Sequence, residues 1–335
     1  MLSIGIIGAG RMGNRHAGNL SKIKDVQVSA VYDINPEQSK AFAEKHPSAR
    51  ICNSLQELVE SPDTGLLIIT SPTYCHAEGL QAALATGKPV FCEKPLCRTR
   101  EEFERLAPIL RAYPNFFAIG FVRRYTPEVL TMKRLIEDGK IGRLLCGDVC
   151  CVYGGFRREW GDWFADYDKS GGVMLDMLAH HCDLQNYFIG KPVSIYAQAF
   201  RLPKEQPKPY DYLSATALFE GNYISNMQCS WMRSGPSDTY LTVQGDKGTL
   251  KLSDIRGLLF YDLEGNETQI EPDKSLLDEK AAPFADNKFA LEMATIVECV
   301  INGKKPLAGA EDAINAMTFC LGMMESAETG KPFKF

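Results

Sequence analysis

The run Leu2–Ile7 (LSIGII) leads directly into Gly8–Ala9–Gly10–Arg11–Met12–Gly13, and this stretch decides the fold. The six residues match the pattern G-x-G-x-x-G, which is weak evidence when it occurs alone. Here it lies between an expected strand and an expected helix, Arg11–Lys22, which is the context that the pattern requires. The N-terminus of such a helix offers free N–H groups and a positive dipole end to a phosphate group.

Each glycine of this turn has its own expected role. Gly8 permits the tight turn, Gly10 lets the backbone approach a pyrophosphate, and Gly13 lets the helix pack on the strand. Asp33 follows the expected strand Val26–Tyr32, where an acid that binds a ribose hydroxyl belongs. A Gly-rich turn beside an ordinary helix-capping Asp is the alternative, and FAD or S-adenosylmethionine could also use such a turn.

Asp33 also bears on the choice of cofactor. Its carboxylate can accept a hydrogen bond from a ribose 2′-OH, and it repels a 2′-phosphate. The next residues are Ile34 and Asn35, so no Arg or Lys follows to hold that phosphate. The sequence therefore favours NAD and disfavours NADP.

Short apolar runs alternate with amphipathic stretches through the first part of the chain. The expected strands are Leu2–Ile7, Val26–Tyr32, Leu66–Thr70, Val90–Cys92 and Phe116–Ile119. The expected helices are Arg11–Lys22, Pro36–Lys45, Leu55–Glu60, His76–Thr86 and Arg100–Ala112. This alternation predicts a doubly wound parallel sheet, a Rossmann domain over residues 1–122.

The pattern changes after about Arg123. The later expected elements are a helix over Pro127–Asp138, a strand over Leu144–Tyr153, a loop over Gly154–Lys169, a helix over Val173–Ile189, consecutive strands from Val193 to Ile270, and helices over Asn287–Ile301 and Ala310–Thr329. Turn signals separate the consecutive strands, which is typical of antiparallel pairing. We therefore expect a second α/β domain over 123–335 with a large open, mainly antiparallel sheet.

Composition excludes several classes of protein. The 335 residues suit two domains, and a net charge of −5 without a basic stripe argues against a nucleic-acid partner. No apolar stretch approaches the roughly 20 residues of a membrane helix, and the N-terminus lacks the features of a signal peptide. The 11 cysteines form no Cys-x-x-Cys pair, which argues against a disulfide framework or structural zinc. Free thiols in a reducing cytoplasm are the simplest account.

Glu93–Lys94–Pro95 is the first candidate for chemistry. It follows the expected strand Val90–Cys92, and ligands of open α/β sheets bind outside the carboxyl ends of the strands. Lys94 is therefore expected beside the nicotinamide end of a cofactor. A solvated Lys in a Pro-bounded loop is the alternative.

A second candidate lies in the stretch from Gly171 to Asp183. On the expected helix, Asp176 and His180 are four residues apart and share a face, and Asp183 can join them. A carboxylate beside an imidazole fixes its tautomer, which makes His180 a suitable general base for an alcohol proton. An ordinary capped helix is one alternative. A metal site that includes His181 is another, but adjacent helical residues cannot converge on one ion, so no metal is expected.

An aromatic and Arg-rich segment precedes that helix. Its notable residues are Tyr153, Arg157, Arg158, Trp160 and Trp163. Aromatic faces together with Arg side chains suit a polyhydroxylated ligand, and a subunit interface is the equal alternative.

With these motifs in place, nearly the whole chain resembles the Gfo/Idh/MocA family of oxidoreductases. The resemblance includes Thr70–Ser71–Pro72 with His76, Gly87–Lys88–Pro89, the E-K-P element, Gly120–Tyr125, and Trp163 through Asp183. It implies a catalytic role for Lys94, with Asp176 and His180 as paired acid and base and Asp183 as a substrate contact or support. The cofactor contacts it implies are Gly8, Gly10, Arg11, Met12, Gly13, Asp33, Thr70, Ser71, Pro72, His76, Glu93 and Lys94. The substrate contacts expected are Lys94, Arg124, Tyr153, Trp160, Trp163, Asp176, His180 and Asp183.

The family resemblance also implies an activity and an assembly. We expect NAD-dependent oxidation of a secondary hydroxyl on a cyclic polyol or sugar, and a homodimer or homotetramer formed through the C-terminal sheet. Leu178 in D-x-L-x-H and the stretch G-F-x-R-R-Y look closest to inositol dehydrogenases. Val122, Val173 and Thr73 depart from forms that are common in the family, which blurs the substrate.

Two other activities within the family stay open. Some members hold NAD tightly and cleave glycosidic bonds, and others are NAD-sensing regulators without catalysis. Biliverdin reductase and dihydrodiol dehydrogenase relatives show that the substrate need not be a sugar.

Overall fold

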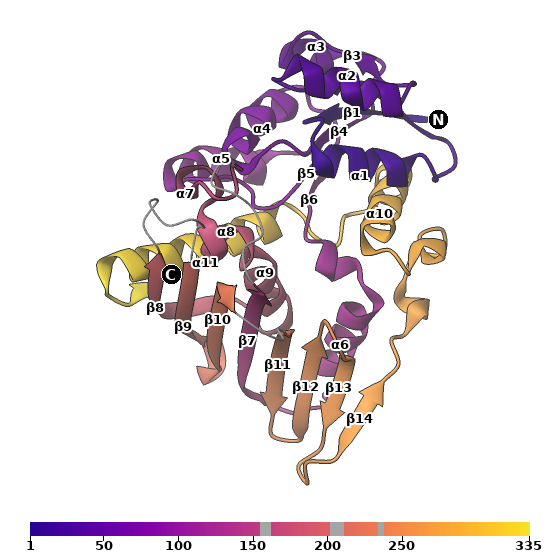
Figure 1. Ribbon diagram of the computed structural model, residues 1–335. Coiled ribbons are helices and arrows are strands. Elements are labelled where there is room, and N and C mark those ends of the chain that lie inside the picture. The colour runs from indigo at the N-terminus through magenta and orange to yellow at the C-terminus, as the bar shows by residue number, and fades with distance from the viewer. Residues whose placement is uncertain (155–161, 202–210, 234–237) are drawn as a thin grey trace. The chain divides into compact units, whose positions relative to one another are not determined.

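The computed structural model describes residues 1–154, 162–201, 211–233 and 238–335 (Figure 1). They divide into two compact units. The first unit contains Met1–Thr126 and Leu277–Ile314, and the second contains Pro127–Leu276 and Asn315–Phe335. This division differs from the expected boundary at 122, because the segment from Leu277 to Ile314 belongs with the Rossmann domain.

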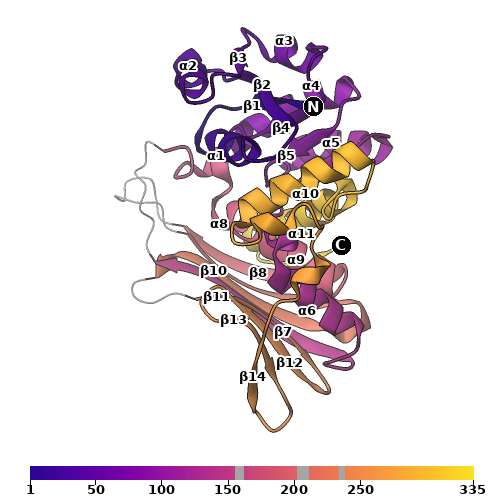
Figure 2. The same ribbon diagram turned by 90° about the vertical axis from the view of Figure 1, so that its right-hand side faces the viewer.

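The first unit is built on a six-stranded parallel sheet with the order β3-β2-β1-β4-β5-β6. Its strands are β1 (Leu2–Ile7), β2 (Val26–Tyr32), β3 (Arg50–Ile51), β4 (Leu66–Ile69), β5 (Val90–Cys92) and β6 (Phe117–Ile119). Its helices are α1 (Arg11–Leu20), α2 (Pro36–Lys45), α3 (Leu55–Glu60), α4 (His76–Ala85), α5 (Arg100–Ala112) and α10 (Lys288–Asn302). Figures 1 and 2 show helices on both sides of this sheet, so the predicted doubly wound architecture is confirmed.

Continuous apolar sequence explains the centre of this sheet. All four residues of β4 are buried, as expected for a parallel strand covered on both faces. One core cluster joins Ile6 and Ile68 of the strands to Leu291 and Val297 of α10. Because α10 also packs against α1, a helix encoded almost 300 residues along the chain completes the Rossmann core.

The second unit is built on a nine-stranded sheet with the order β14-β13-β12-β11-β7-β10-β9-β8-β15. The strands are β7 (Leu144–Gly154), β8 (Pro192–Arg201), β9 (Asp211–Phe219), β10 (Ile224–Arg233), β11 (Thr239–Gly245), β12 (Gly248–Ser253), β13 (Gly257–Tyr261), β14 (Glu267–Ile270) and β15 (Phe333–Lys334). Neighbouring strands are antiparallel except for the parallel pair β7 and β10. The expected mainly antiparallel sheet is therefore confirmed.

Helices cover one face of this second sheet. They include α6 (Pro127–Glu137), α8 (Gly172–Asp176) and α9 (Ala179–Phe188), with the short α7 (Tyr167–Ser170) before α8. Figure 2 shows α6 and α9 on the same face, and α8 contacts strands β9 and β10. The remaining long helix, α11 (Ala310–Thr329), contains the division between the two units. No helix in the described part of the chain is both long and apolar enough to cross a bilayer.

Candidate active site

The turn after β1 depends on glycine at two positions. Gly8 has a φ of +103°, and a Cβ on it would lie 2.5 Å from the amide nitrogen of Ser71. A Cβ on Gly13 would lie 2.2 Å from the carbonyl oxygen of Gly8, so α1 packs directly against the turn. The hydroxyl of Thr70 donates a hydrogen bond of 2.7 Å to that same carbonyl and joins the turn to the end of β4.

Gly10 differs from these two glycines because its surroundings are open. A Cβ built on it meets no described atom within 4 Å. Gly10 is also the N-cap of α1, and among the described residues no side chain caps this helix end. Arg11 is exposed and Met12 is half-buried beside it. Space next to uncapped N–H groups at a helix N-terminus fits the pyrophosphate of a dinucleotide.

The carboxylate of Asp33 lies against the same turn. One oxygen accepts a hydrogen bond of 2.8 Å from the amide of Ala9, and the other accepts one of 2.9 Å from the amide of Asn35. These two bonds hold the acid at the end of β2, beside the phosphate-binding turn. The position and the chemistry fit a carboxylate that accepts from a ribose hydroxyl.

The loops after β4 and β5 are joined by a buried histidine. The ring nitrogens of His76 lie 2.7 Å from the carbonyl oxygen of Pro95 and 2.9 Å from that of Ser71. Burial lowers the pKa of His76, and the two carbonyl oxygens oppose that shift only in part. His76 is 1% exposed, and these two contacts make it a brace between the two loops. Pro72 is half-buried.

The E-K-P element lies at the same sheet edge as the Gly turn. Strands β1, β4 and β5 are parallel neighbours, with Ile69 paired to both Ile7 and Cys92, so the residues after each strand emerge together. Lys94 is half-buried there, and its bond to Pro95 is cis. The structure thus brings Lys94 to the edge of the sheet that carries the dinucleotide-binding turn.

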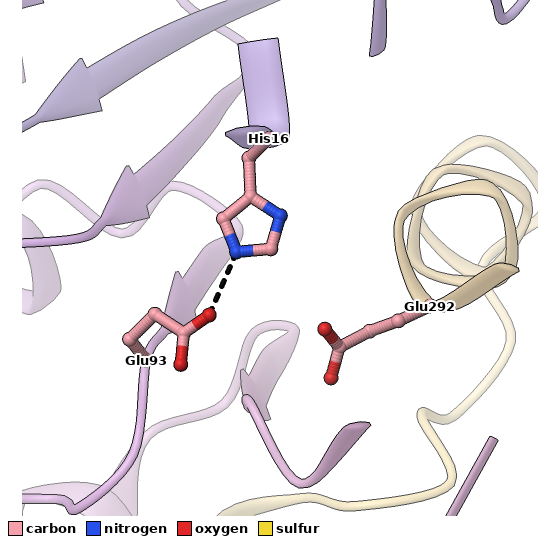
Figure 3. A group of neighbouring side chains, drawn as sticks. All are labelled: His16, Glu93 and Glu292. Carbon is pink, nitrogen blue, oxygen red and sulfur yellow. Dashed lines mark hydrogen bonds and ion pairs between the residues drawn. The ribbon is translucent and has the colours of Figure 1, made fainter. Parts of the chain in front are cut away.

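Glu93 belongs to a buried group of side chains that the sequence did not predict. Glu93 is 8% exposed, and one carboxylate oxygen lies 2.7 Å from Nε2 of His16, as Figure 3 shows. Glu292 of α10 directs its carboxylate toward the same pair. A signal for His16 was present in the sequence, since Gly13, His16 and Ala17 recur at helical spacing on the buried face of α1.

The expected helix over Val173–Ile189 is wrong, because the structure breaks it between α8 and α9. The amide of Leu178 donates to the carbonyl of Val173, five residues back, and this wider turn interrupts the regular ladder. Asp176 is the last residue of α8 and His180 is the second residue of α9. Both are half-buried, but they do not share one continuous helix. Such wide turns recur at functional sites.

Three other expected substrate contacts differ from one another in burial and in their neighbours. Asp183 is 1% exposed within α9. Arg124 is 4% exposed and donates to the carbonyl of Leu307 at 2.9 Å and to the carboxylate of Asp312 at 2.9 Å, so these buried contacts engage the guanidinium that was expected to bind substrate. Trp163 is half-buried and stacks on Phe164, with ring centroids 3.8 Å apart.

Part of the expected aromatic segment lies outside the described residues. Arg157, Arg158 and Trp160 lie outside the described residues, and so does the side chain of Tyr153, whose backbone belongs to β7.

A parallel sheet of this strand order, a Gly turn on α1 and an acid after β2 define a dinucleotide-binding Rossmann protein. The chain belongs to the Gfo/Idh/MocA family of oxidoreductases. The family model described as "Oxidoreductase family, NAD-binding Rossmann fold" matches residues 2–121, and the "GFO/IDH/MocA C-terminal domain" matches residues 129–251. The expected family and enzyme class are therefore confirmed, and the chain is an NAD-binding oxidoreductase.

Individual relatives agree with this assignment. The chain is 32% identical over 257 residues to "Uncharacterized oxidoreductase YrbE" of Bacillus subtilis (strain 168), covering 75% of this chain and 74% of that protein. It is 25% identical over 335 residues to the scyllo-inositol 2-dehydrogenase (NAD(+)) of the same organism, covering 98% and 94%. The solved structure of levoglucosan dehydrogenase in complex with NADH shares the fold, with a TM-score of 0.86, 19% identity and coverage of 99% and 98%.

Proposed function

We propose that the chain oxidises a secondary hydroxyl of a cyclic polyol or sugar, in the manner of an inositol dehydrogenase. The observation that carries the proposal is the position of Lys94 at the sheet edge that bears the dinucleotide-binding turn. Strand β4 separates β5 from β1 in the sheet, so Lys94 follows a strand that is not adjacent to the phosphate-binding turn, and we assign it to the reacting end of the substrate. The similarity to scyllo-inositol 2-dehydrogenase (NAD(+)) supports a polyol as the substrate class.

In the proposed mechanism one side chain takes up the hydroxyl proton and another stabilises the negative charge on the substrate oxygen. His180 accepts the hydroxyl proton as the general base, and Asp176 stabilises the resulting imidazolium. The Lys94 ammonium stabilises negative charge on the substrate oxygen, a preorganised cation where the alkoxide forms. NAD, when bound, supplies the acceptor for the hydride that leaves the substrate carbon. The Gly turn and Asp33 would hold the cofactor, and the half-buried Trp163 would pack on a sugar ring.

Turnover by the native protein and by Lys94→Ala tests the proposal. A panel of inositols, aldoses and aldonates is supplied with NAD or NADP, and the absorbance of the reduced nicotinamide is followed. We expect a signal with NAD that falls by at least ~100-fold in the variant, because removing one preorganised charge costs about that much. NAD still binds to the variant, as measured by its effect on thermal unfolding. Unchanged turnover in Lys94→Ala would remove Lys94 from the mechanism.

Absence of turnover across the panel would have a different meaning. If NAD binds and no substrate reacts, a glycoside-cleaving enzyme with permanently bound NAD or a non-catalytic NAD-sensing regulator becomes the better description. NAD that co-purifies and is never released would separate the first of these from the second.

We also propose that the second sheet mediates assembly with a second copy of the chain in a reducing cytoplasm. Tyr196 and Phe200 of β8 are 41% and 52% exposed, although both are large apolar side chains. The 11 cysteines are free thiols, which suits a reducing compartment. Phe200→Glu should convert a dimer or tetramer to a smaller species in light scattering, and a native monomer would refute the interface.

A further inference from the structure

A buried cluster of three titratable residues lies inside the first unit, next to the E-K-P element. His16 comes from α1, Glu93 from the end of β5 and Glu292 from α10 (Figure 3). Their exposed fractions are 0%, 8% and 0%, and the facing nitrogen and oxygen atoms all lie within 4.8 Å of one another. Three elements that are distant in sequence therefore direct polar groups to one point in an otherwise apolar core.

The two carboxylates of this cluster have unequal surroundings. Glu93 is bound on both oxygens, one facing Nε2 of His16 at 2.7 Å and the other accepting from the amide of Lys94 at 3.2 Å. Neither oxygen of Glu292 has a hydrogen-bond partner within the described part of the chain. A buried charge without a partner costs far more than a protonated carboxyl does.

Charge and burial decide which acid holds the proton. Burial raises the pKa of Glu292 well above its ordinary value, and the negative charge of Glu93 raises it further. Lys288, one turn earlier on α10, opposes the shift to a smaller extent. The protonated Glu292 can then donate to the Glu93 carboxylate after a rotation of its side chain, which places donors on two sides of that carboxylate.

Glu93 in turn occupies a tight slot beside Lys94. A Cβ built on Gly120 would lie 2.9 Å from a Glu93 carboxylate oxygen and 3.2 Å from its Cα, so this position leaves the Glu93 side chain no room on that side. We propose that Glu292 is a positioning residue for Lys94, because its carboxylic acid and His16 together fix the Glu93 carboxylate that holds the Lys94 backbone. The inference rests on the catalytic role proposed for Lys94.

A divalent cation held by the three side chains is the competing explanation, and the geometry argues against it. Nε2 of His16 lies at hydrogen-bond distance from Glu93, and because an ionised carboxylate can only accept, we assign the proton of that bond to Nε2. A nitrogen that donates to Glu93 has no lone pair to offer to a metal ion. The metal content of the protein, measured below, tests this explanation directly.

The test compares Glu292→Gln, which keeps a donor of the same shape, with Glu292→Leu, which removes it. We expect kcat of Glu292→Gln to stay within about threefold of native, while kcat of Glu292→Leu falls by ~10–100-fold, since small misplacements cost this much. Turnover is expressed per NAD-binding site, so that a partly unfolded sample is not mistaken for an effect on Lys94. Equal losses in both variants, or native kcat in Glu292→Leu, would overturn the proposal.

Two readouts do not depend on turnover. Infrared difference spectra of native protein and Glu292→Gln should show a protonated carboxyl C=O band that only the native protein has. Absence of that band, or one equivalent of divalent metal in the native protein that is lost in Glu292→Gln, would overturn it as well. If instead Lys94→Ala keeps native turnover while the band is present, the catalytic role proposed for Lys94 fails and the protonation of Glu292 stands.

Gly120→Ala supplies an independent perturbation of the same carboxylate. Its methyl group displaces the Glu93 side chain directly, so we expect it to reproduce the loss of kcat seen with Glu292→Leu. If both changes act through Glu93, the double variant loses much less than the product of the two single losses. Multiplicative losses would show that Glu292 acts elsewhere.

Discussion

Three glycines in and before α1 can be used to test which one leaves room for a ligand and which one is required for packing. Gly10, Gly13 and Gly18 lie at the N-cap, in the first turn and near the end of α1, and we consider changing each to Ala. A Cβ at Gly13 lies 2.2 Å from a backbone carbonyl oxygen, whereas at Gly10 and Gly18 it meets no described atom within 4 Å. The three variants add the same methyl group, but it meets different surroundings, and Gly10 is an N-cap while Gly13 and Gly18 are inside the helix.

The expected stabilities follow from these contacts. Gly18→Ala should stabilise the protein by about 0.5–1 kcal/mol, because Ala is the better residue inside a helix. Gly13→Ala gains the same propensity but forces the turn and α1 apart, and overpacking of this kind costs ~1–3 kcal/mol or more. For a unit of this size each kcal/mol moves Tm by roughly 2–4 °C. We therefore expect Gly13→Ala to melt several degrees below Gly18→Ala.

Gly10→Ala should show a different phenotype. The free energy of unfolding of this variant without NAD should change by about 1 kcal/mol or less, as for a modest change of N-cap residue. Its affinity for NAD should fall at least tenfold, or ~1.4 kcal/mol, because the methyl group occupies the space assigned to the pyrophosphate. Thermal unfolding with and without NAD measures both quantities, since a ligand of the native state raises Tm. Native NAD affinity in Gly10→Ala, or Gly13→Ala melting above Gly18→Ala, would refute the reasoning.

The remaining predictions concern three other sites. Asp33→Ser removes the acid held by Ala9 and Asn35, so the ratio of NADP to NAD affinity, measured by titration, should rise at least tenfold, or ~1.4 kcal/mol. Burial lowers the pKa of His76 below 6.5, so the stability that its neutral form provides is complete above pH 6.5 and is lost as the pH falls toward the folded pKa. The free energy of unfolding in urea should therefore fall less between about pH 7.5 and pH 5 in His76→Gln than in the native protein. Tyr223 buries a hydroxyl that has no partner among the described residues, so Tyr223→Phe should raise the unfolding free energy by about 1 kcal/mol, and a loss of stability would show that the hydroxyl is satisfied.

The Rossmann sheet could be predicted because its strands are continuous apolar runs. The expected Leu2–Ile7 and Val90–Cys92 coincide with β1 and β5, where burial on both faces makes the sequence locally unambiguous. Strand β3 was missed, since it consists of Arg50 and Ile51, both exposed at the edge of the sheet. Two exposed residues carry no periodicity, and only their pairing with β2 makes them a strand.

The break between α8 and α9 could not be read from the residues that form it. Met177 and Leu178 are good helix formers, and both have right-handed helical backbone angles. The interruption is a change of hydrogen-bond register, in which the amide of Leu178 reaches the carbonyl of Val173. A register change of this kind depends on how the segment packs, so the i,i+4 argument for Asp176 and His180 assumed a regularity that local sequence does not guarantee.

The packing of α10 in the Rossmann core could not be predicted from apolar periodicity, but the buried polar residues of the helices contained a signal for it. The apolar face of α10 predicts burial without saying against which sheet. That face also carries Glu292, and the buried face of α1 carries His16. A titratable group on an apolar face needs a polar partner once it is buried, so two helices that each carry one are candidates to pack together. Buried polar residues can therefore indicate which helices meet when apolar periodicity shows only that each one is buried.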